Sequence, residues 1–259
     1  MNNNFAILIL SCDRYADLWP VALKQFRKHF EQNSYKIYFG SNTRKCEDPD
    51  VIPLLSGEDR DWSSSYLAIL EKIPEKKLFV LLEDLLAVST IDSSRFAACV
   101  EFLVHNNANH IKYWPNPNPD RSSDNPEFKI YDRGAPYRAT VCGFWDREYL
   151  ISLLLEGESP WDFEIMGSYR TSYVDGFYGL NKPLFEFKNL IEKGCWIPQS
   201  LEWAEKEGIE LDLNKRPILQ GRRQLVSRIK MAYFSLMIRV PWRSRVKWMN
   251  VLRRALISY

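Results

Sequence analysis

Two adjacent carboxylates, Glu83 and Asp84, stand at the end of the apolar run 78–82, which is typical of a buried β-strand. The chain returns to apolar residues at once, at Leu85. A carboxylate beside a buried strand is costly unless a cation lies close to it. That cation is either a divalent metal that accompanies a nucleotide or a nearby arginine, and the residue types leave both interpretations open.

A second group of acids lies in residues 157–164, GESPWDFE, where Asp162 and Glu164 flank Phe163, and Trp161 precedes Asp162. A carboxylate beside aromatic surface tends to have a raised pKa and can act as a general base. Aromatic faces also suit sugar rings. The alternative is a capped helix start, because Ser159 stands three residues before an acid.

Several common sites are absent from the sequence. It contains no GxxxxGK[ST], GxGxxG or GxSxG motif, which argues against a P-loop, a Rossmann dinucleotide site or an α/β-hydrolase. The five cysteines are scattered and form no CxxC pair, and there are only three histidines. A disulfide framework or a structural zinc site is therefore not expected, and a reducing, cytoplasmic setting is favoured.

The elements that must position these acids follow from hydrophobic periodicity. The first part of the chain predicts alternating strands and helices: strands over 5–10, 35–42, 51–55 and 77–84, and helices over 16–31, 61–73 and 92–106. Such near-continuous apolar strands indicate an α/β fold with a mostly parallel sheet covered on both faces. The polar segments that end these strands, SCDRY, GSN and ED, should then face one crevice.

The later part of the chain predicts a Pro- and Asn-rich loop over 114–127, a strand over 137–145, a helix over 146–159 and a strand over 183–191. No internal repeat or linker appears before about residue 212. We therefore predict one domain over 1–212, followed by a tail over 213–259.

The tail 213–259 is basic. It holds 12 of the 35 Lys and Arg residues and no Asp or Glu, which leaves 23 basic against 33 acidic residues in 1–212. Apolar residues recur at helical spacing over 224–240 and again after Pro241, so a basic amphipathic helical tail is expected. Such a helix fits in-plane binding to an anionic membrane surface. The alternatives are a helix packed on the acidic body or an oligomer contact, and the acidic body argues against nucleic acid.

The segments ILSCDRYADLW, YFGSN, GEDRDWSSSYLAILEKI, LFVLLEDLL, PYRATVCGFW and GESPWDFEIMGS follow in an order that resembles a family of bacterial glycosyltransferase-like proteins. The family occurs in polysaccharide, lipopolysaccharide and O-antigen synthesis and has the nucleotide-diphospho-sugar transferase (GT-A) fold. The resemblance covers about residues 5–215. It implies a GT-A-like, Rossmann-related mixed sheet flanked by helices.

By this resemblance, Glu83 and Asp84 occupy the place of an acidic motif that holds Mn²⁺ or Mg²⁺ against the donor diphosphate. The negative charge of the leaving diphosphate needs such stabilisation. Leu85 stands where a second Asp is often found, so metal-independent transfer is the alternative.

The resemblance also places other residues near the nucleotide-sugar donor: Asp13, Arg14, Tyr15, Asn42, Trp62 and Ser63. Asp13 could accept a hydrogen bond from a base or ribose, Arg14 could meet a phosphate, and Tyr15 could stack. Each has a structural alternative, because Asp13 could cap the next helix and Asp61 or Ser63 could cap a helix on which Trp62 packs.

For the acceptor side, the resemblance implies Glu164 as the base, with Asp162 as the alternative, in a mechanism for which inversion is slightly favoured. Arg138, Trp161 and Arg170 are candidates for acceptor or phosphate contacts, although solvated surface arginines are common. The expected activity is transfer of a sugar to a lipid-linked glycan at the cytoplasmic face of the cell membrane. The alternative is a catalytically silent GT-A-like module that binds glycan or scaffolds a synthesis complex.

Overall fold

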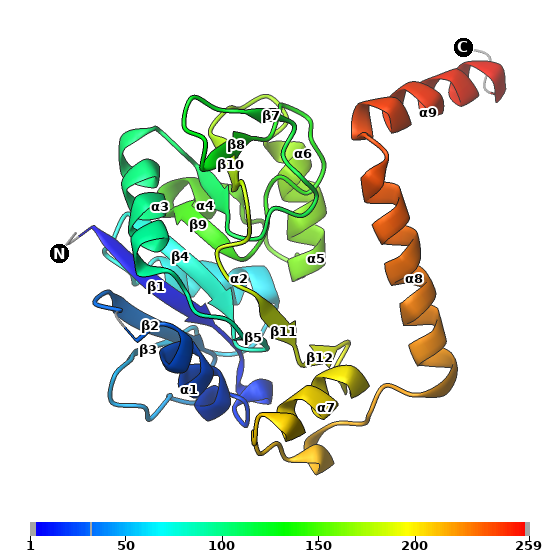
Figure 1. The fold of residues 1–259 in the computed structure, drawn as a ribbon. Helices are drawn as coiled ribbons and strands as arrows, with labels where there is room; N and C mark the ends of the chain where they lie inside the picture. The colour runs from blue at the N-terminus through cyan, green and yellow to red at the C-terminus, as the bar shows by residue number, and fades with distance from the viewer. Residues whose placement is uncertain (1–3, 32, 257–259) are drawn as a thin grey trace.

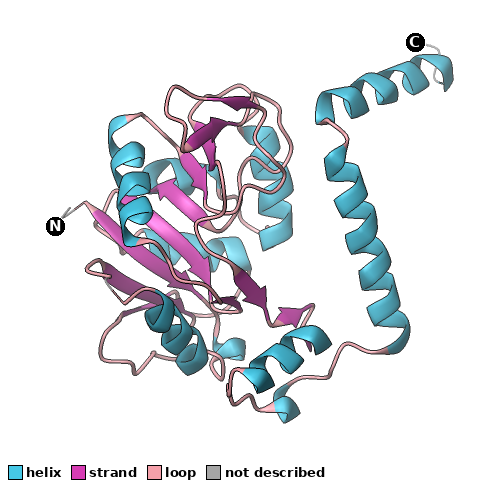
Figure 2. Cartoon of the chain, in the orientation of Figure 1, coloured by secondary structure: helices cyan, strands magenta, loops and turns pink. Residues whose placement is uncertain are grey.

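The computed structural model describes residues 4–31 and 33–256, which fold around one large mixed β-sheet (Figures 1 and 2). Within this part of the chain the sheet has nine strands, in the order β3-β2-β1-β4-β9-β6-β10-β8-β7. The strands are β1 (Phe5–Leu10), β2 (Lys36–Ser41), β3 (Ile52–Leu55), β4 (Lys77–Leu82), β6 (His110–Lys112), β7 (Arg121–Ser122), β8 (Phe128–Ile130), β9 (Gly143–Asp146) and β10 (Phe177–Leu180). The predicted α/β fold, with a mixed sheet flanked by helices, is confirmed.

Strand β1 is the centre of the parallel half of the sheet. It pairs in parallel with β2 on one side and with β4 on the other, and β2 pairs in parallel with β3. The chain therefore builds outward from β1 to β3 and then crosses back to the opposite side of β1. This reversal makes a topological switch point between β1 and β4, beyond whose carboxyl ends open α/β sheets bind their ligands.

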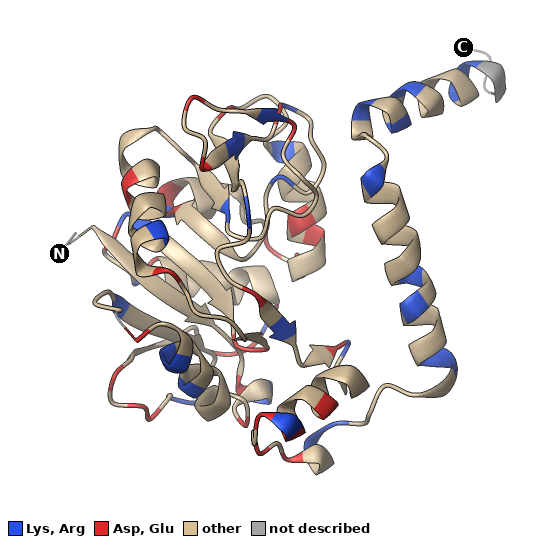
Figure 3. Cartoon of the chain, in the orientation of Figure 1, with Lys and Arg blue, Asp and Glu red and all other residues tan. Residues whose placement is uncertain are grey.

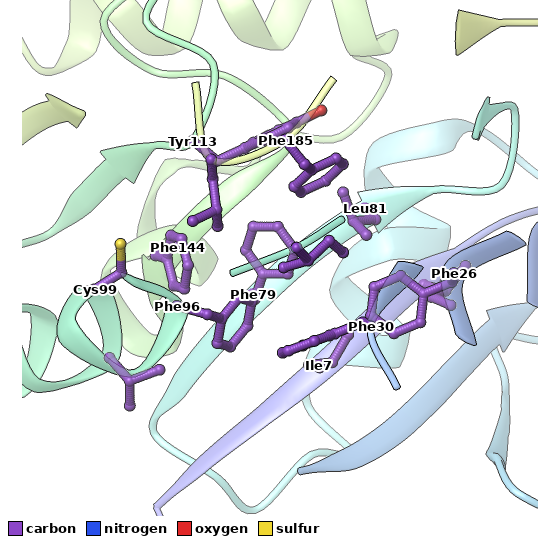
Figure 4. Close-up of a cluster of buried hydrophobic side chains, with 14 of the residues drawn as sticks. Ile7, Phe26, Phe30, Phe79, Leu81, Phe96, Cys99, Tyr113, Phe144 and Phe185 are labelled. Atoms are coloured by element: carbon purple, nitrogen blue, oxygen red, sulfur yellow. The ribbon is translucent and has the colours of Figure 1, made fainter. Parts of the chain in front are cut away.

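Helices cover both faces of the sheet. They are α1 (Trp19–His29), α2 (Trp62–Leu70), α3 (Ser93–His105) and α4 (Arg147–Leu153). Residues of β1 alternate between the two faces: Ile7 belongs to the cluster under α1 and α3, and Leu8 to the cluster under α2 and α4. The first cluster is rich in aromatic rings, and Phe79 of β4 and Phe96 of α3 meet edge to face with centroids 5.1 Å apart (Figure 4).

The second half of the sheet departs from the sequence prediction. The predicted strand over 137–145 is wrong for its first part, because β9 begins only at Gly143. That glycine has φ +143° and a Cβ built on it would lie 2.6 Å from the His110 ring, so a larger residue would not fit there. Strands β6, β8 and β10 were not predicted, because each has only three or four residues, too few to show a period.

Beyond these differences, α4 ends at Leu153, earlier than predicted, and the predicted strand over 183–191 is split in two. Two small antiparallel pairs are separate from the nine-stranded sheet: β5 (Leu85–Ala87) with β11 (Phe187–Asn189), and β12 (Ile191–Glu192) with β13 (Cys195–Trp196). The other helical elements before α8 (Gly221–Arg239) are η1 (Asp13–Tyr15), α5 (Pro160–Asp162), η2 (Phe163–Gly167), α6 (Ser168–Arg170), α7 (Pro198–Lys206) and η3 (Leu213–Lys215).

Two long helices end the described chain, α8 (Gly221–Arg239) and α9 (Trp242–Leu256), and they stand away from the sheet (Figure 1). The elbow between them contacts the domain through Trp242, whose indole Nε1 donates to the Asp120 carboxylate at 2.7 Å, and through an ion pair of Arg243 with Asp132. Among the described residues, none of the helices combines the length and the apolar character that crossing a bilayer requires. The division into 1–212 and 213–259 stays a prediction.

Candidate functional site

The loops after β1, β2 and β4 meet at the switch point. Asp13 in η1, just after β1, and Asn42, just after β2, bond to each other twice: each backbone N–H donates to the other's side chain at 3.1 Å. Glu83 and Asp84 follow β4 directly, and β4 is the neighbour of β1 in the sheet. The donor-side residues predicted from these three segments therefore gather at one edge of the sheet.

Asp13 holds this edge together. Besides Asn42, its carboxylate accepts the backbone N–H groups of Thr43 at 3.0 Å and Arg44 at 3.1 Å, and the Thr43 hydroxyl at 2.5 Å. Burial would raise the pKa of Asp13, but these hydrogen bonds outweigh it and the pKa lies below its usual value. The carboxylate thus fixes the loop after β2 instead of capping a helix.

Glu83, which is buried, and Asp84, which is half-buried, form an acid pair. Burial, and then the neighbouring Asp84, raise the pKa of Glu83 well above its usual value. Burial also raises the pKa of Asp84 to about 6, although Arg216 acts to lower it. The Asp84 carbonyl accepts the backbone N–H of Leu190 at 3.0 Å, and Leu85 opens strand β5. The chain turns apolar after the acids because it forms a small sheet there.

Arg216 is the cation whose charge acts to lower the pKa of both acids, and the sequence did not single it out. It is buried, donates to both carboxylate oxygens of Asp17 at 2.6 and 2.7 Å, and donates to the Arg14 carbonyl at 3.1 Å. Its guanidinium lies over the rings of Tyr15, 4.8 Å from the centroid, and Trp196, 5.0 Å away. One signal could have pointed to it: a buried acid pair requires a cation, and the tail holds many.

The acid pair supplies the oxygen ligands that Mg²⁺ and Mn²⁺ prefer. No group of three or more His, Cys, Asp or Glu side chains in 4–31 and 33–256 is arranged to hold a metal ion. Mg²⁺ commonly binds through one or two carboxylates, with water and substrate phosphates as its other ligands. Glu83 and Asp84 therefore fit a cation that arrives with a phosphate ligand.

The two acids of the second group differ in burial, since Asp162 is exposed and Glu164 is half-buried. Ser159 and Asp162 form a capping box, with the Asp162 backbone N–H donating to the Ser159 hydroxyl at 3.2 Å and the Asp162 carboxylate accepting from Ser159. These bonds lower the pKa of the exposed Asp162. Glu164 in η2 is half-buried, and its carboxylate accepts the Val141 N–H at 3.2 Å. Burial raises the pKa of Glu164, partly offset by the charge of Lys112.

Lys112 in β6 is the second charged residue that the sequence did not reveal. It is buried, and its Nζ donates to the carbonyls of Asn116 at 2.5 Å and Tyr137 at 2.9 Å. Burial lowers the pKa of Lys112 to about 7, while Glu164 acts to raise it. A buried amine and a half-buried carboxylate with displaced pKa values are typical of a site that moves a proton.

Trp62 and Ser63 take part in the start of helix α2, as the structural alternative to donor binding predicted. Asp61 caps α2 by accepting the Ser64 N–H at 2.9 Å and also accepts the Ser63 hydroxyl at 2.7 Å. Trp62 packs on Tyr66, with ring centroids 5.3 Å apart. The Ser63 oxygen also accepts the Glu158 N–H at 3.1 Å, so the start of α2 is tied to the segment that carries the second acid group.

The remaining residues predicted as acceptor or phosphate contacts have different environments. Arg170 makes a two-pronged ion pair with Glu158 at 2.7 and 2.8 Å. Trp161 is 65% exposed at the start of α5 and is open to a ligand. Arg138 is buried, and it donates to the carbonyls of Asp132 and Val174, so its guanidinium stabilises a loop.

Comparisons with known proteins give weak similarities. No family model and no curated protein matches the chain. A putative glucose-1-phosphate thymidylyltransferase from Bacillus anthracis, in complex with a sucrose, is 10% identical over 85% of this chain and 98% of its own, with a TM-score of 0.45. CMP:2-keto-3-deoxy-manno-octonic acid synthetase, complexed with CTP, is 11% identical over 80% and 98%, with a TM-score of 0.43.

The apo-form glycosyltransferase GlyE of Streptococcus pneumoniae is 18% identical over 36% of this chain, with a TM-score of 0.28. The matched region spans 26% of the length of GlyE. All three TM-scores lie below 0.5, so the fold and the site described above rest on the geometry of this chain.

Proposed function

We propose that the chain is a glycosyltransferase that moves a sugar from a nucleotide-sugar donor to a hydroxyl of a lipid-linked glycan in cell-surface polysaccharide synthesis. The observation that carries the proposal is the acid pair of buried Glu83 and half-buried Asp84, both with raised pKa values, at the switch point between β1 and β4. Ligands bind at this edge of open α/β sheets. The resemblance to GT-A glycosyltransferases over residues 5–215 supports a diphosphate donor there.

On the donor side, Glu83 and Asp84 would hold Mn²⁺ or Mg²⁺, which would stabilise the charge of the leaving diphosphate. Asp13 and Asn42 shape the wall of the crevice through their mutual bonds. Tyr15 presents its ring beside the guanidinium of Arg216 and is the candidate to stack on the base.

On the acceptor side, Glu164 is favoured over Asp162 as the base. The Asp162 carboxylate is engaged in a capping box and has a lowered pKa, whereas burial raises the pKa of Glu164 above its usual value and so makes it the stronger base. In the proposed inverting step, the acceptor oxygen bonds to the anomeric carbon as the bond from that carbon to the donor phosphate breaks. The nucleoside diphosphate leaves with the electron pair, and Glu164 takes the hydroxyl proton.

The basic tail is proposed to hold the protein peripherally on the inner face of the cell membrane. Large apolar side chains on both tail helices are exposed, among them Leu225, Tyr233 and Trp248. Basic residues and no acidic ones are drawn along α8 and α9 in Figure 3. A basic, apolar surface of this kind is suited to an anionic bilayer, where a lipid-linked acceptor would be found.

A catalytically silent module is the second candidate. The observation that favours it is the small number of metal-binding side chains at the acid pair, because Leu85 begins β5 and supplies no third carboxylate. Such a module would bind glycan or scaffold a synthesis complex without transferring sugar.

A thermal-shift screen of the full chain with UDP, GDP, CDP and TDP, each with and without Mn²⁺, tests the donor site. A matching nucleotide at a hundredfold excess over its Kd should stabilise the fold by about 3 kcal/mol. Asp84→Asn should remove the Mn²⁺-dependent part, and the control Asp162→Asn should keep it. No shift with any nucleotide would reject the donor site. Binding without release of nucleoside diphosphate from any sugar nucleotide, with a lipid-linked glycan present, would favour the silent module.

A further inference from the structure

A hollow of about 620 Å³ lies between the β12–β13 turn and the first turns of α8. Its volume falls in the range of about 300–1,000 Å³ that small-molecule sites occupy. The hollow is separate from the acid pair and from Glu164, since none of those residues lines it. None of the predicted catalytic, donor or acceptor residues lines it, and its α8 residues belong to the predicted tail 213–259.

The lining of this hollow is strongly cationic. Lys193 comes from the β12–β13 turn, and Arg222, Arg223 and Lys230 come from α8. Among the ion pairs of the described residues, none involves any of these four side chains. The acid in the lining is Glu192, whose carboxylate accepts the Ser227 hydroxyl at 2.7 Å and so ties the turn to the helix. Four cations against one carboxylate favour an anionic ligand.

The start of α8 adds to this preference. The helix begins at Gly221, and the side chain of Gln220 makes no capping bond, so the first backbone N–H groups have no side-chain cap. The positive end of the helix dipole therefore acts in the same direction as Arg222 and Arg223.

The rest of the lining is apolar, with Cys195 and Leu219 buried and Val226 on α8. A free inorganic anion would not use these residues. An amphiphile with a phosphate group and an apolar chain would use both parts of the lining. The same helix also exposes the apolar side chains of Leu225 and Ile229, which flank Val226 in sequence.

We propose that this hollow binds the phosphate headgroup of an anionic lipid. It then gives the tail a defined lipid site in addition to its general positive charge. The inference rests on the membrane association in the proposed function but not on sugar transfer, and it is tested without measuring activity.

The test compares two triple variants of the full chain that remove equal charge from the tail. One is Arg222→Gln, Arg223→Gln, Lys230→Gln in the hollow; the other is Lys247→Gln, Arg253→Gln, Arg254→Gln on α9. All of these side chains are exposed, so glutamine should leave the fold intact. Binding is measured by flotation with vesicles of 70% phosphatidylcholine and 30% phosphatidylglycerol, and with pure phosphatidylcholine vesicles as the reference.

General adsorption would weaken equally in the two variants, because each basic residue near an anionic surface contributes a similar amount. A lipid site predicts that the hollow variant loses about tenfold more affinity for the anionic vesicles than the α9 variant. Equal losses would overturn the site while leaving membrane association in place. Failure of the unmodified chain to bind anionic vesicles would overturn the membrane association itself.

A second arm distinguishes a lipid headgroup from free phosphate. The melting temperature is measured in sodium phosphate and in sodium chloride of equal ionic strength, for the unmodified chain and the hollow variant. A phosphate-specific rise that the hollow variant loses, without a difference in vesicle binding, would support an anion site but reject the lipid. No phosphate-specific rise together with equal vesicle losses would reject the site entirely.

Discussion

Arg216 and Asp17, 199 positions apart in the chain, form a two-pronged ion pair at 2.6 and 2.7 Å beside the acid pair Glu83 and Asp84. The pair links the segment before the tail helices to the loop after β1. The Arg216 guanidinium also opposes the rise in the pKa of Asp84 that burial causes, so it supplies part of the positive charge that the acids require.

We predict that Arg216→Gln destabilises the fold by about 3 kcal/mol, because it leaves Asp17 without its partner in a largely buried place. Chemical denaturation measures this. The double variant Asp17→Asn, Arg216→Gln should be less destabilised than the single one, since Asp17 then no longer leaves an unpaired charge. Lys28→Gln is the control: its pair with Glu207 is exposed at 3.2 Å, and its loss should cost less than about 1 kcal/mol. Equal costs for the two single variants would contradict the role assigned to Arg216.

The two candidate bases should differ in their effect on sugar transfer. Glu164→Gln should lower kcat by about 10²- to 10⁴-fold, the range in which general base catalysis contributes, with little change in donor binding. Asp162→Asn should cost about 1 kcal/mol of stability through the weakened cap and leave kcat within a few-fold. Release of nucleoside diphosphate from the sugar nucleotide is the measurement. The reverse pattern would move the base to Asp162.

The buried Lys112 predicts an unusual dependence of stability on pH. Burial lowers its pKa to about 7 from a usual value near 10.5. Between pH 7 and pH 10.5 the unfolded chain therefore binds more protons than the folded chain, so the free energy of unfolding should rise with pH across this window. The gain should be on the order of a few kcal/mol.

Replacing Lys112 with Met should remove that rise, whatever its effect on stability at a single pH. Urea denaturation at several pH values between 7 and 10 measures the slope. Lys129→Met on strand β8, which β10 separates from β6 in the sheet, is the matched control and should keep the slope of the unmodified chain. A rise that persists in Lys112→Met would show that Lys112 is protonated in the folded protein throughout this range.

Strands β1, β2 and β4 were predictable because each is a largely apolar run of six residues that supplies side chains to both cores, as Ile7 and Leu8 of β1 illustrate. Their parallel order also placed Asp13, Asn42 and Glu83 at one edge. Strand β6 was not predictable, since a three-residue strand that contains a buried His and a buried Lys looks polar in sequence. It carries Lys112, so the partner of Glu164 was missed with it.

Arg216 was missed for a different reason. In sequence it is one of twelve cations in a tail without acids. Its position depends on the chain returning past β13, where Trp196 and Ile218 form an isolated bridge, to reach the loop after β1. A contact across about 200 residues leaves no local pattern, and the requirement of the acid pair for a cation was the available signal.

The elbow between α8 and α9 should control how firmly the tail is held against the domain. The Trp242 indole donates to Asp120 at 2.7 Å, and its ring lies over Gly134, where a Cβ would be 3.6 Å away. Trp242→Phe removes the hydrogen bond to the carboxylate, which contributes about 1.5–3 kcal/mol. We predict faster hydrogen exchange in α9, measured by mass spectrometry, with little change in the melting temperature of the domain. Trp248→Phe is the control, because Trp248 is 69% exposed on the same helix and should leave exchange unchanged. Equal acceleration in both variants would show that α9 responds to any loss of indole, and the elbow contact would then not be what holds it.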